Sequence, residues 1–383
     1  MPDWLPAQRV RARPGDGVVR ELLNDLQRWH RQGRRVALAR VVDVEGSGPR
    51  EPGAAMAVND QGEVAGSVSG GCVEGAVVTE ALALLEARAT GRICTFGYSD
   101  DEAFAVGLTC GGTIHLFLEE LDWWDRFERV ASAIAEERPV AMATVVRGPD
   151  AGRAIVVEPG GVAGGTLGEA DLDRVATRDA FAELDAGTSA VRHYGEHGEA
   201  RQDEVAVFIE TYAPPPRMLI FGAVDFTAAL VRVAKVLGYR VTVCDAREVF
   251  ATTQRFPLAD EVVVDWPHRL LERVGAGLGP RDAVCVLTHD HKFDVPAIRA
   301  ALATGVGYLG AMGSRRTSEE RTARLVEEGV TQAELARIMA PIGLDLGART
   351  PEETAVAICA EIIAQRTGVA APSLRDADGP IHR

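Results

Sequence analysis

A hydrophobic pattern that occurs twice constrains the fold of this 383-residue chain more than any other feature. Val36-Ala-Leu-Ala-Arg-Val-Val is followed much later by Val140-Ala-Met-Ala-Thr-Val-Val. The later parts of the pattern also recur: Gly62-Glu-Val-Ala-Gly with Gly161-Val-Ala-Gly, a helical pattern over 73–88 with one over 170–185, and the strand pattern Ile114–Leu118 with Val205–Ile209. Such self-similarity indicates an internally duplicated α/β unit, with copies at about 17–122 and 123–212.

The two copies differ at two loops. The first copy has Gly46-Ser-Gly-Pro-Arg-Glu-Pro-Gly where the second has Arg147-Gly-Pro-Asp-Ala-Gly-Arg. It also has Gly66-Ser-Val-Ser-Gly-Gly-Cys-Val-Glu-Gly where the second has Gly165-Thr-Leu-Gly-Glu. A framework requirement acts on both copies, whereas chemistry need occur in only one. Arg50 and Cys72 are therefore our candidate catalytic residues.

Cys72 comes just before a run with apolar residues at helical spacing, so we place it at or near a helix N-terminus. Free backbone N–H groups and the helix dipole favour anions there and lower a thiol pKa. The flanking glycines let a flat or anionic ligand approach the backbone. The alternative is that Cys72 is a small buried residue and the glycines only make a tight turn.

A second domain follows the duplicated one. We expect domain boundaries at 1–212 and 217–368, joined by a proline-rich linker over 213–216 and followed by a loose tail over 369–383. Strand patterns alternate with helical patterns in 217–368, which is typical of a Rossmann-like, doubly wound parallel sheet. The predicted fold class is α/β in both domains.

The turn after the first strand of this domain is a candidate nucleotide site. Gly222 lies where a dinucleotide fold places its phosphate-binding turn, and Asp245 ends the next strand, where a ribose-binding acid belongs. Only one glycine of the G-x-G-x-x-G pattern is present, however. Val224 would crowd a pyrophosphate and Asp225 adds negative charge, so NAD(P) binding is an open alternative here.

Two further loops of this domain each have two interpretations. His289, His291 and their neighbouring aspartates are either a metal site or a polar loop in which Asp294 caps the next helix. Ser314 and Arg315 either hold a phosphate or form a helix N-cap followed by solvated charge. Thr350-Pro-Glu-Glu353 predicts a helix start with a capping box.

The composition excludes several classes. The formal net charge of −15 argues against nonspecific nucleic-acid binding and against attachment to an acidic membrane. No apolar run is long enough to span a membrane or to serve as a signal peptide, so we expect a cytoplasmic protein. The six cysteines include no C-x-x-C pair, which excludes a disulfide scaffold, a common zinc site built on cysteine pairs, and ferredoxin-like iron–sulfur ligation.

These residues together resemble the XdhC/CoxI family, maturation proteins for molybdenum hydroxylases such as xanthine dehydrogenase and carbon monoxide dehydrogenase. The matching segments are GSGPREPGAAMAV, GSVSGGCVEGAV, CGG, FGA with a later VCDAR, LTHDHKFD, GYLGAMGSRR and PIGLDLGARTPEETAVAICAEIIA. The resemblance implies a domain that handles molybdenum cofactor (molybdopterin) and a Rossmann-like C-terminal domain. Many members have Gly-Ala-Gly-His where this chain has Gly222-Ala-Val-Asp.

The resemblance also implies which residues bind the cofactor. Cys72 would either ligate the molybdenum or lie beside its dithiolene, Arg50 and the helix start would hold the pterin phosphate, and Cys110 would be a second thiol. The implied cofactor-binding set in the first domain is Ser47, Gly48, Arg50, Ser69, Gly70, Gly71, Cys72 and Cys110. The implied partners are a molybdenum hydroxylase apo-enzyme and a cysteine desulfurase, with a homodimer as the candidate assembly.

Our first hypothesis is therefore an accessory protein that holds molybdenum cofactor and assists its sulfuration and insertion, rather than an enzyme that turns over a substrate. The competing hypothesis is an NAD(P)-dependent oxidoreductase centred on Gly222 and Asp245. A further alternative is a protein that carries the name of a xanthine dehydrogenase subunit only by association. A third hypothesis is a structural or regulatory subunit in which Cys72 is inert.

Overall fold

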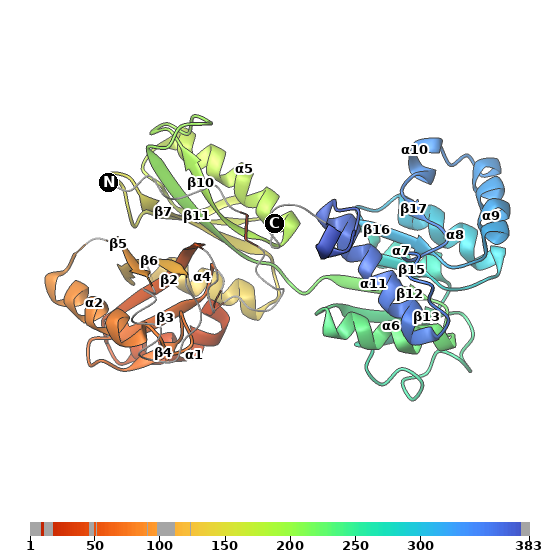
Figure 1. Ribbon diagram of the computed structural model, residues 1–383, viewed down its shortest axis with the longest axis horizontal. Coiled ribbons are helices and arrows are strands. Elements are labelled where there is room, and N and C mark those ends of the chain that lie inside the picture. Colours follow the sequence, from red (N-terminus) through yellow and green to blue (C-terminus); the bar gives the residue numbers. More distant parts are fainter. Residues whose placement is uncertain are drawn as a thin grey trace. The chain divides into compact units, whose positions relative to one another are not determined.

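The chain divides between Pro214 and Pro215 into two units, and each has hydrophobic cores of its own (Figure 1). In the computed structural model the described residues are 9–10, 18–45, 50, 52–89, 91–97, 112–122 and 124–376. Within this part of the chain, no helix combines the length and apolar character needed to cross a membrane.

The first repeat forms an antiparallel sheet in the order β4-β3-β2-β6-β5. Its elements are α1 (Val18–Arg31), β2 (Val36–Glu45), β3 (Ala55–Asn59), β4 (Val64–Gly66), α2 (Glu74–Ala87), β5 (Arg92–Gly97) and β6 (Thr113–Glu120). The helical pattern at 73–88 predicts α2 to within one residue at each end.

The second repeat has the same elements in the same order, which confirms the predicted duplication. Its sheet runs β9-β8-β7-β11-β10, and β1 (Arg9–Val10) pairs with β10 at the outer edge. The elements are α4 (Trp124–Ala135), β7 (Val140–Arg147), β8 (Ala154–Glu158), β9 (Gly161–Gly165), α5 (Ala170–Ala186), β10 (Ser189–Tyr194) and β11 (Val205–Tyr212). We did not predict β10 from the sequence.

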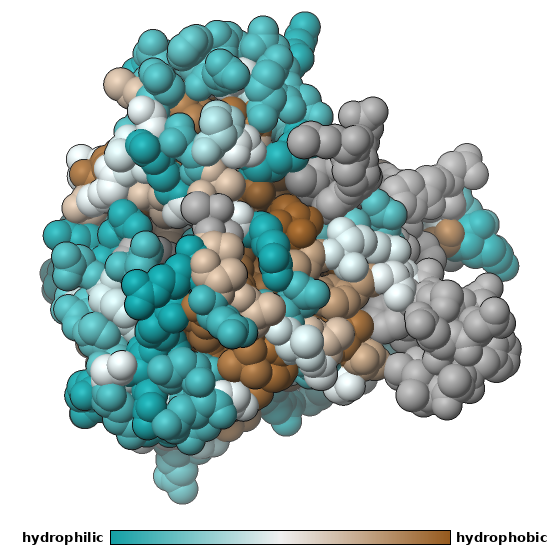
Figure 2. Space-filling view, turned by 90° about the vertical axis from the view of Figure 1, so that its left-hand side faces the viewer, coloured by the Kyte–Doolittle hydropathy of each residue, from teal (hydrophilic) through white to brown (hydrophobic). Residues whose placement is uncertain are grey.

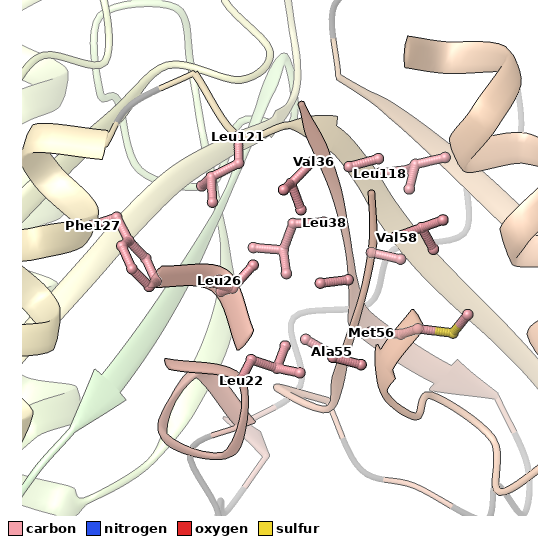
Figure 3. Packing of buried hydrophobic residues seen from close by; sticks show 14 of the residues in the cluster. Leu22, Leu26, Val36, Leu38, Ala55, Met56, Val58, Leu118, Leu121 and Phe127 are labelled. Atoms are coloured by element: carbon pink, nitrogen blue, oxygen red, sulfur yellow. The ribbon is translucent and has the colours of Figure 1, made fainter. Parts of the chain in front are cut away.

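The central strands β2 and β7 are buried along almost their whole length, which accounts for their runs of apolar residues on both faces. On one face of β2, Leu38 lies with Leu26 of α1 and Phe127 of α4, whereas Val58 of β3 and Leu118 of β6 lie on the opposite face, as Figure 3 shows. On the same face as Leu38, a smaller cluster joins residues of the two repeats: Val42, Phe117, Val146, Val191, Ala206 and Phe208. The duplicated unit is therefore two sheets that share one apolar layer.

A buried ionic cluster also joins the two repeats. Arg40 of β2 is fully buried and forms ion pairs with Glu119 of β6 and Glu210 of β11. Its Nη1 also donates to Thr144 Oγ1 of β7 at 3.3 Å. The strand registers pair Leu38 with Glu119 and Met142 with Glu210, so the two glutamates occupy equivalent positions. One arginine thus neutralises the equivalent glutamate of each repeat.

The second unit is a six-stranded parallel sheet in the order β14-β13-β12-β15-β16-β17. This is the 3-2-1-4-5-6 order of dinucleotide-binding folds, so the prediction of a Rossmann-like doubly wound domain is confirmed. The strands are β12 (Arg217–Phe221), β13 (Arg240–Asp245), β14 (Glu261–Val264), β15 (Ala283–Val286), β16 (Tyr308–Ala311) and β17 (Ile338–Met339).

Helices cover both faces of this sheet (Figure 1). Residues of α6 and α11 join one apolar cluster, and residues of α7, α8 and α9 join the other. The helices are α6 (Asp225–Val236), α7 (Pro267–Val274), α8 (His291–Leu302), α9 (Arg315–Glu327), α10 (Gln332–Leu335) and α11 (Pro351–Thr367), with short 3-10 turns at Gly275–Gly277 and Leu374–Asp376. Thr350 and Glu353 form the predicted capping box at the start of α11.

Candidate functional site

The loop before α2 is organised around the carboxylate of Glu74, the first residue of the helix. Glu74 Oε1 accepts from the Ser67 hydroxyl at 2.6 Å and from the Ser69 N–H at 2.9 Å. Glu74 Oε2 accepts from the Ser69 hydroxyl, from the Gly71 N–H at 2.9 Å and from the Val73 N–H at 3.2 Å. The carboxylate thus takes the position that an external anion would occupy at a helix N-terminus.

Serine hydroxyls bind the remaining amides of this loop. Ser67 Oγ accepts from the Gly70 N–H at 2.9 Å, and Ser69 Oγ accepts from the Cys72 and Val73 N–H groups at 3.0 Å each. Ser69 itself is buried. The amides of residues 69–73 are therefore all donated within the loop, which fixes its shape without a ligand.

Glu74 is ionised at neutral pH. Burial alone would raise its pKa, but the hydrogen bonds from Ser67 and Ser69 outweigh burial and lower the pKa to about 2. A charged carboxylate makes stronger hydrogen bonds than a neutral acceptor, so the clamp is a charge-assisted one.

The glycines of the loop serve two different purposes. Gly66 has a positive φ of 77°, and a Cβ there would lie 2.5 Å from the Ala55 carbonyl oxygen. Gly70 and Gly71 also have positive φ, of 77° and 120°, but a Cβ on either would meet no atom within 4 Å. Packing requires Gly66, whereas Gly70 and Gly71 bend the chain beside open space.

The second repeat has the same clamp without the loop. Asp173 accepts from the Thr166 hydroxyl seven residues earlier at 2.9 Å, just as Glu74 accepts from Ser67 seven residues earlier. Helix α5 nevertheless begins at Ala170, three residues before its acid, whereas α2 begins at its acid. The first repeat has thus unwound the first turn of its helix. The thiol of Cys72 lies in this unwound segment, Gly71-Cys72-Val73.

Cys72 is half-buried, has a free thiol and packs against the core of the first repeat. Its position just before α2 agrees with the predicted helix start. Arg50 is exposed. Of the other residues implied by the resemblance, Ser47, Gly48 and Cys110 lie outside the described residues. Figure 2 shows the side of the molecule on which α2 lies in Figure 1, where hydrophobic surface is flanked by hydrophilic residues.

In the second unit, Gly222 and Asp245 lie together at the carboxyl ends of β12 and β13. Asp245 Oδ2 accepts from the Ala223 N–H at 2.8 Å, and its carboxylate forms a two-pronged ion pair with Arg247. Gly222 has a φ of 110°, and a Cβ there would lie 2.9 Å from Thr288 Cγ2. Packing against Thr288 therefore accounts for the glycine at position 222. The carboxylate of Asp245 already accepts hydrogen bonds from Ala223 and Arg247.

Our interpretation of Asp294, in the loop that follows β15, is wrong. Asp294 does not cap α8: the N-cap is Asp290, whose side chain accepts from the Lys292 N–H. Asp294 is instead buried inside the first turn, where it accepts from the Thr288 hydroxyl and pairs with buried Arg321 at 2.9 Å. Two aspartates four residues apart both suit a helix start, and burial decides between them.

Ser314 is the N-cap of α9 and accepts from the Thr317 N–H at 3.1 Å. Arg315 follows it in the first turn, on the exposed side. Among the described residues, one group of metal-ligating side chains converges, namely Asp43, Glu45 and His115, and it does not include His289 or His291. Sequence reasoning missed this group. The alternation of Asp43 and Glu45 at the end of a strand was the only signal for it.

Two family models match the chain. The model described as the XdhC and CoxI family matches residues 29–97 and 133–195, and the XdhC Rossmann domain matches residues 218–362. Together they cover well over half of the chain, including both repeats and the parallel sheet. The chain belongs to the XdhC and CoxI family.

Relatives agree with this membership, and a solved structure has the same fold. A Bacillus subtilis protein named as a probable xanthine dehydrogenase subunit is 29% identical over 337 residues, covering 87% of this chain and 94% of that protein. The molybdenum cofactor insertion chaperone PaoD of Escherichia coli is 26% identical, covering 87% of this chain and 84% of that protein. A crystal structure described as a xanthine dehydrogenase from Bacillus halodurans has the same fold, with a TM-score of 0.62 and 24% identity over 92% of this chain and 97% of that one.

Proposed function

We propose that this protein is a maturation factor that binds molybdenum cofactor as cargo and assists its sulfuration and insertion into a molybdenum hydroxylase. Family membership and the likeness to an insertion chaperone support the proposal. We place the binding site at the unwound first turn of α2, because this turn contains Cys72 and has no counterpart in the second repeat.

The donor set of this loop fits such a cargo. A thiol is a soft ligand for a transition metal, and the open space beside Gly70 and Gly71 leaves room for a flat group. The amides of residues 69–73 are already donated to Glu74 and the two serines, so they do not carry the binding. We assign the contacts to the Cys72 thiol and the exposed Arg50 guanidinium, which suits a phosphate.

The test uses cofactor released from a molybdenum hydroxylase. After incubation and gel filtration, molybdenum and pterin are measured per chain. We expect about one cofactor per wild-type chain and loss of retention in Cys72→Ala. Cys94→Ala is the matched control, since Cys94 is also a half-buried free thiol of the first repeat. Equal retention by both variants would remove Cys72 from the site, and no retention by the wild type would reject the function.

The oxidoreductase hypothesis has one observation in its favour, the strand order of the second unit. Against it, Asp245 is tied to Arg247 and Ala223, and Gly222 is explained by packing against Thr288. Titration with NAD(H) and NADP(H) in the same experiment separates the two functions. Tight nucleotide binding without cofactor retention would favour the oxidoreductase. Val224→Gly tests whether crowding at the turn limits affinity, because it should then increase nucleotide binding.

A further inference from the structure

A β-bulge near the end of β2 brings three metal-ligating side chains together. Val41 pairs with Leu116 and Asp43 pairs with His115, so Val42 is the extra residue of the bulge. Asp43 and Glu45, two residues apart, then lie on the same face as His115 of β6.

The donor atoms are close enough to share one ion. The ligating atoms of Asp43, Glu45 and His115 all lie within 4.8 Å of one another. His115 Nε2 lies 3.4 Å from Glu45 Oε1. Two ligands of a tetrahedral zinc ion with bonds of about 2.0–2.1 Å are separated by about the same distance.

The imidazole is oriented by a second contact. His115 Nδ1 lies 3.0 Å from Thr95 Oγ1 of the neighbouring strand β5. When Nδ1–H donates to this hydroxyl, the lone pair of Nε2 points toward the carboxylates, as in most histidine metal ligands.

Asp43 supplies an independent indication of a ligand. It is 3% exposed, and Oδ2 has no hydrogen-bond partner within the part of the chain that the structure describes. A buried carboxylate oxygen without a partner is costly unless a proton or a cation satisfies it. Glu45 is half-exposed and opens the group to solvent.

The second repeat has the same β-bulge at this position but lacks the metal-ligating side chains. The same bulge occurs in β7, where Val145 pairs with Val207 and Arg147 with Ala206. The equivalents of Asp43 and His115 are therefore Arg147 and Ala206, neither of which suits a cation. The bulge belongs to the fold of both repeats, whereas the donor set is present in one. A purely structural need for the bulge does not account for the donors.

We propose that Asp43, Glu45 and His115 form a binding site for a divalent first-row transition-metal ion, of which Zn²⁺ is the best-matched probe. One imidazole nitrogen and two carboxylate oxygens suit Zn²⁺ better than Mg²⁺ or Ca²⁺, which prefer oxygen ligands alone. Three protein ligands leave a fourth position open to water or another small ligand. The site shares no residue with the Cys72 loop, and the proposal does not depend on the cargo of that loop.

Glu45→Gln provides the central test, because a half-exposed side chain can lose its charge without unfolding the sheet. Its matched control is Glu80→Gln, since Glu45 and Glu80 are 48% and 44% exposed and both belong to the first repeat. Equilibrium dialysis with Zn²⁺ should show one site in the wild type that is weakened at least about tenfold in Glu45→Gln, because removal of even an outer-shell partner costs about 10- to 100-fold. Glu80→Gln should bind like the wild type.

Co²⁺ distinguishes this site from binding by thiols. A site made of imidazole and carboxylates gives ligand-field bands without a thiolate charge-transfer band, and His115→Gln should abolish them in protein whose circular dichroism is unchanged. Wild-type protein without a Zn²⁺ site, affinity unchanged in Glu45→Gln, or cobalt bands of thiolate type would each overturn the proposal. If His115→Gln does not fold, Glu45→Gln decides alone.

Discussion

Glu74 and Asp173 accept hydrogen bonds from hydroxyl groups at the same spacing, seven residues before each acid, in the two repeats. Only Glu74 has an unwound helical turn beneath it. We expect Glu74→Gln to release this turn, because a neutral amide cannot accept from the Ser67, Ser69 and Gly71 donors as strongly. Hydrogen exchange of residues 69–73 should accelerate, with a loss of stability on the order of 1–2 kcal/mol.

The control for this change is Asp173→Asn, which should accelerate exchange near Thr166 and Leu167 and leave the Cys72 loop as it is. Unchanged exchange of residues 69–73 in Glu74→Gln would show that the serines alone hold the loop.

Alanine substitutions should separate the two kinds of glycine. Gly66→Ala places a Cβ 2.5 Å from the Ala55 carbonyl oxygen and 2.8 Å from Leu22 Cδ2, so backbone must move. Gly70→Ala meets no atom within 4 Å and costs only its positive φ, about 1–2 kcal/mol. Urea denaturation should therefore rank Gly66→Ala as the more destabilised variant. The reverse order would mean that the loop before α2 is more rigid than the edge of the sheet.

Arg40 should be among the least replaceable residues of the first unit. Arg40→Met removes the charge that neutralises Glu119 and Glu210, and breaking a buried ion pair in this way costs about 3–5 kcal/mol. The triple variant Arg40→Met, Glu119→Gln, Glu210→Gln should recover part of the loss, because no buried carboxylate is then left ionised. The free energies of unfolding from urea titrations test both statements. Equal stability of Arg40→Met and the wild type would contradict them.

Asp245 should make the second unit sensitive to acid. Burial favours the protonated form, but hydrogen bonds from Arg247 and the Ala223 N–H outweigh it and lower the pKa of Asp245 below its ordinary 3.8. A lowered pKa in the folded state stabilises the fold above the ordinary pKa, and this stabilisation is lost as pH falls through the folded-state value.

The measurement for Asp245 is hydrogen exchange of β12 and β13 between pH 7 and acid. We expect wild-type protection to fall below about pH 4 and Asp245→Asn to lack this component, while being less stable at pH 7. An identical acid dependence in the variant would mean that other carboxylates control it.

The sequence predicts the repeated framework well because hydrophobic spacing is a local property. The helix expected at 73–88 begins at Glu74, and the parallel, doubly wound sheet of the second unit follows from its alternating pattern. β10 was missed because Ser189, Arg192 and His193 interrupt its apolar character.

The candidate sites depend on contacts that spacing does not reveal. The bulge at Val42 becomes visible only when β2 is paired with β6, and that pairing places Asp43 opposite His115. The Glu74 clamp likewise requires the loop geometry, although the Ser67 to Glu74 spacing has a counterpart in Thr166 and Asp173. The capping box at Thr350 was predicted correctly, whereas the prediction that Asp294 caps α8 was wrong and Glu74 was not predicted as an internal acceptor.

The shared arginine restricts how the two halves can be recombined. Arg40 occupies the position that Thr144 occupies in the other repeat, since their strand partners are Phe117 and Phe208. A symmetric protein made from two second halves would bury two glutamates with no cation between them, and one made from two first halves would crowd two guanidinium groups. When the two halves are expressed together as separate chains, we therefore expect them to form a heterodimer rather than two homodimers, because only the heterodimer balances the buried charges.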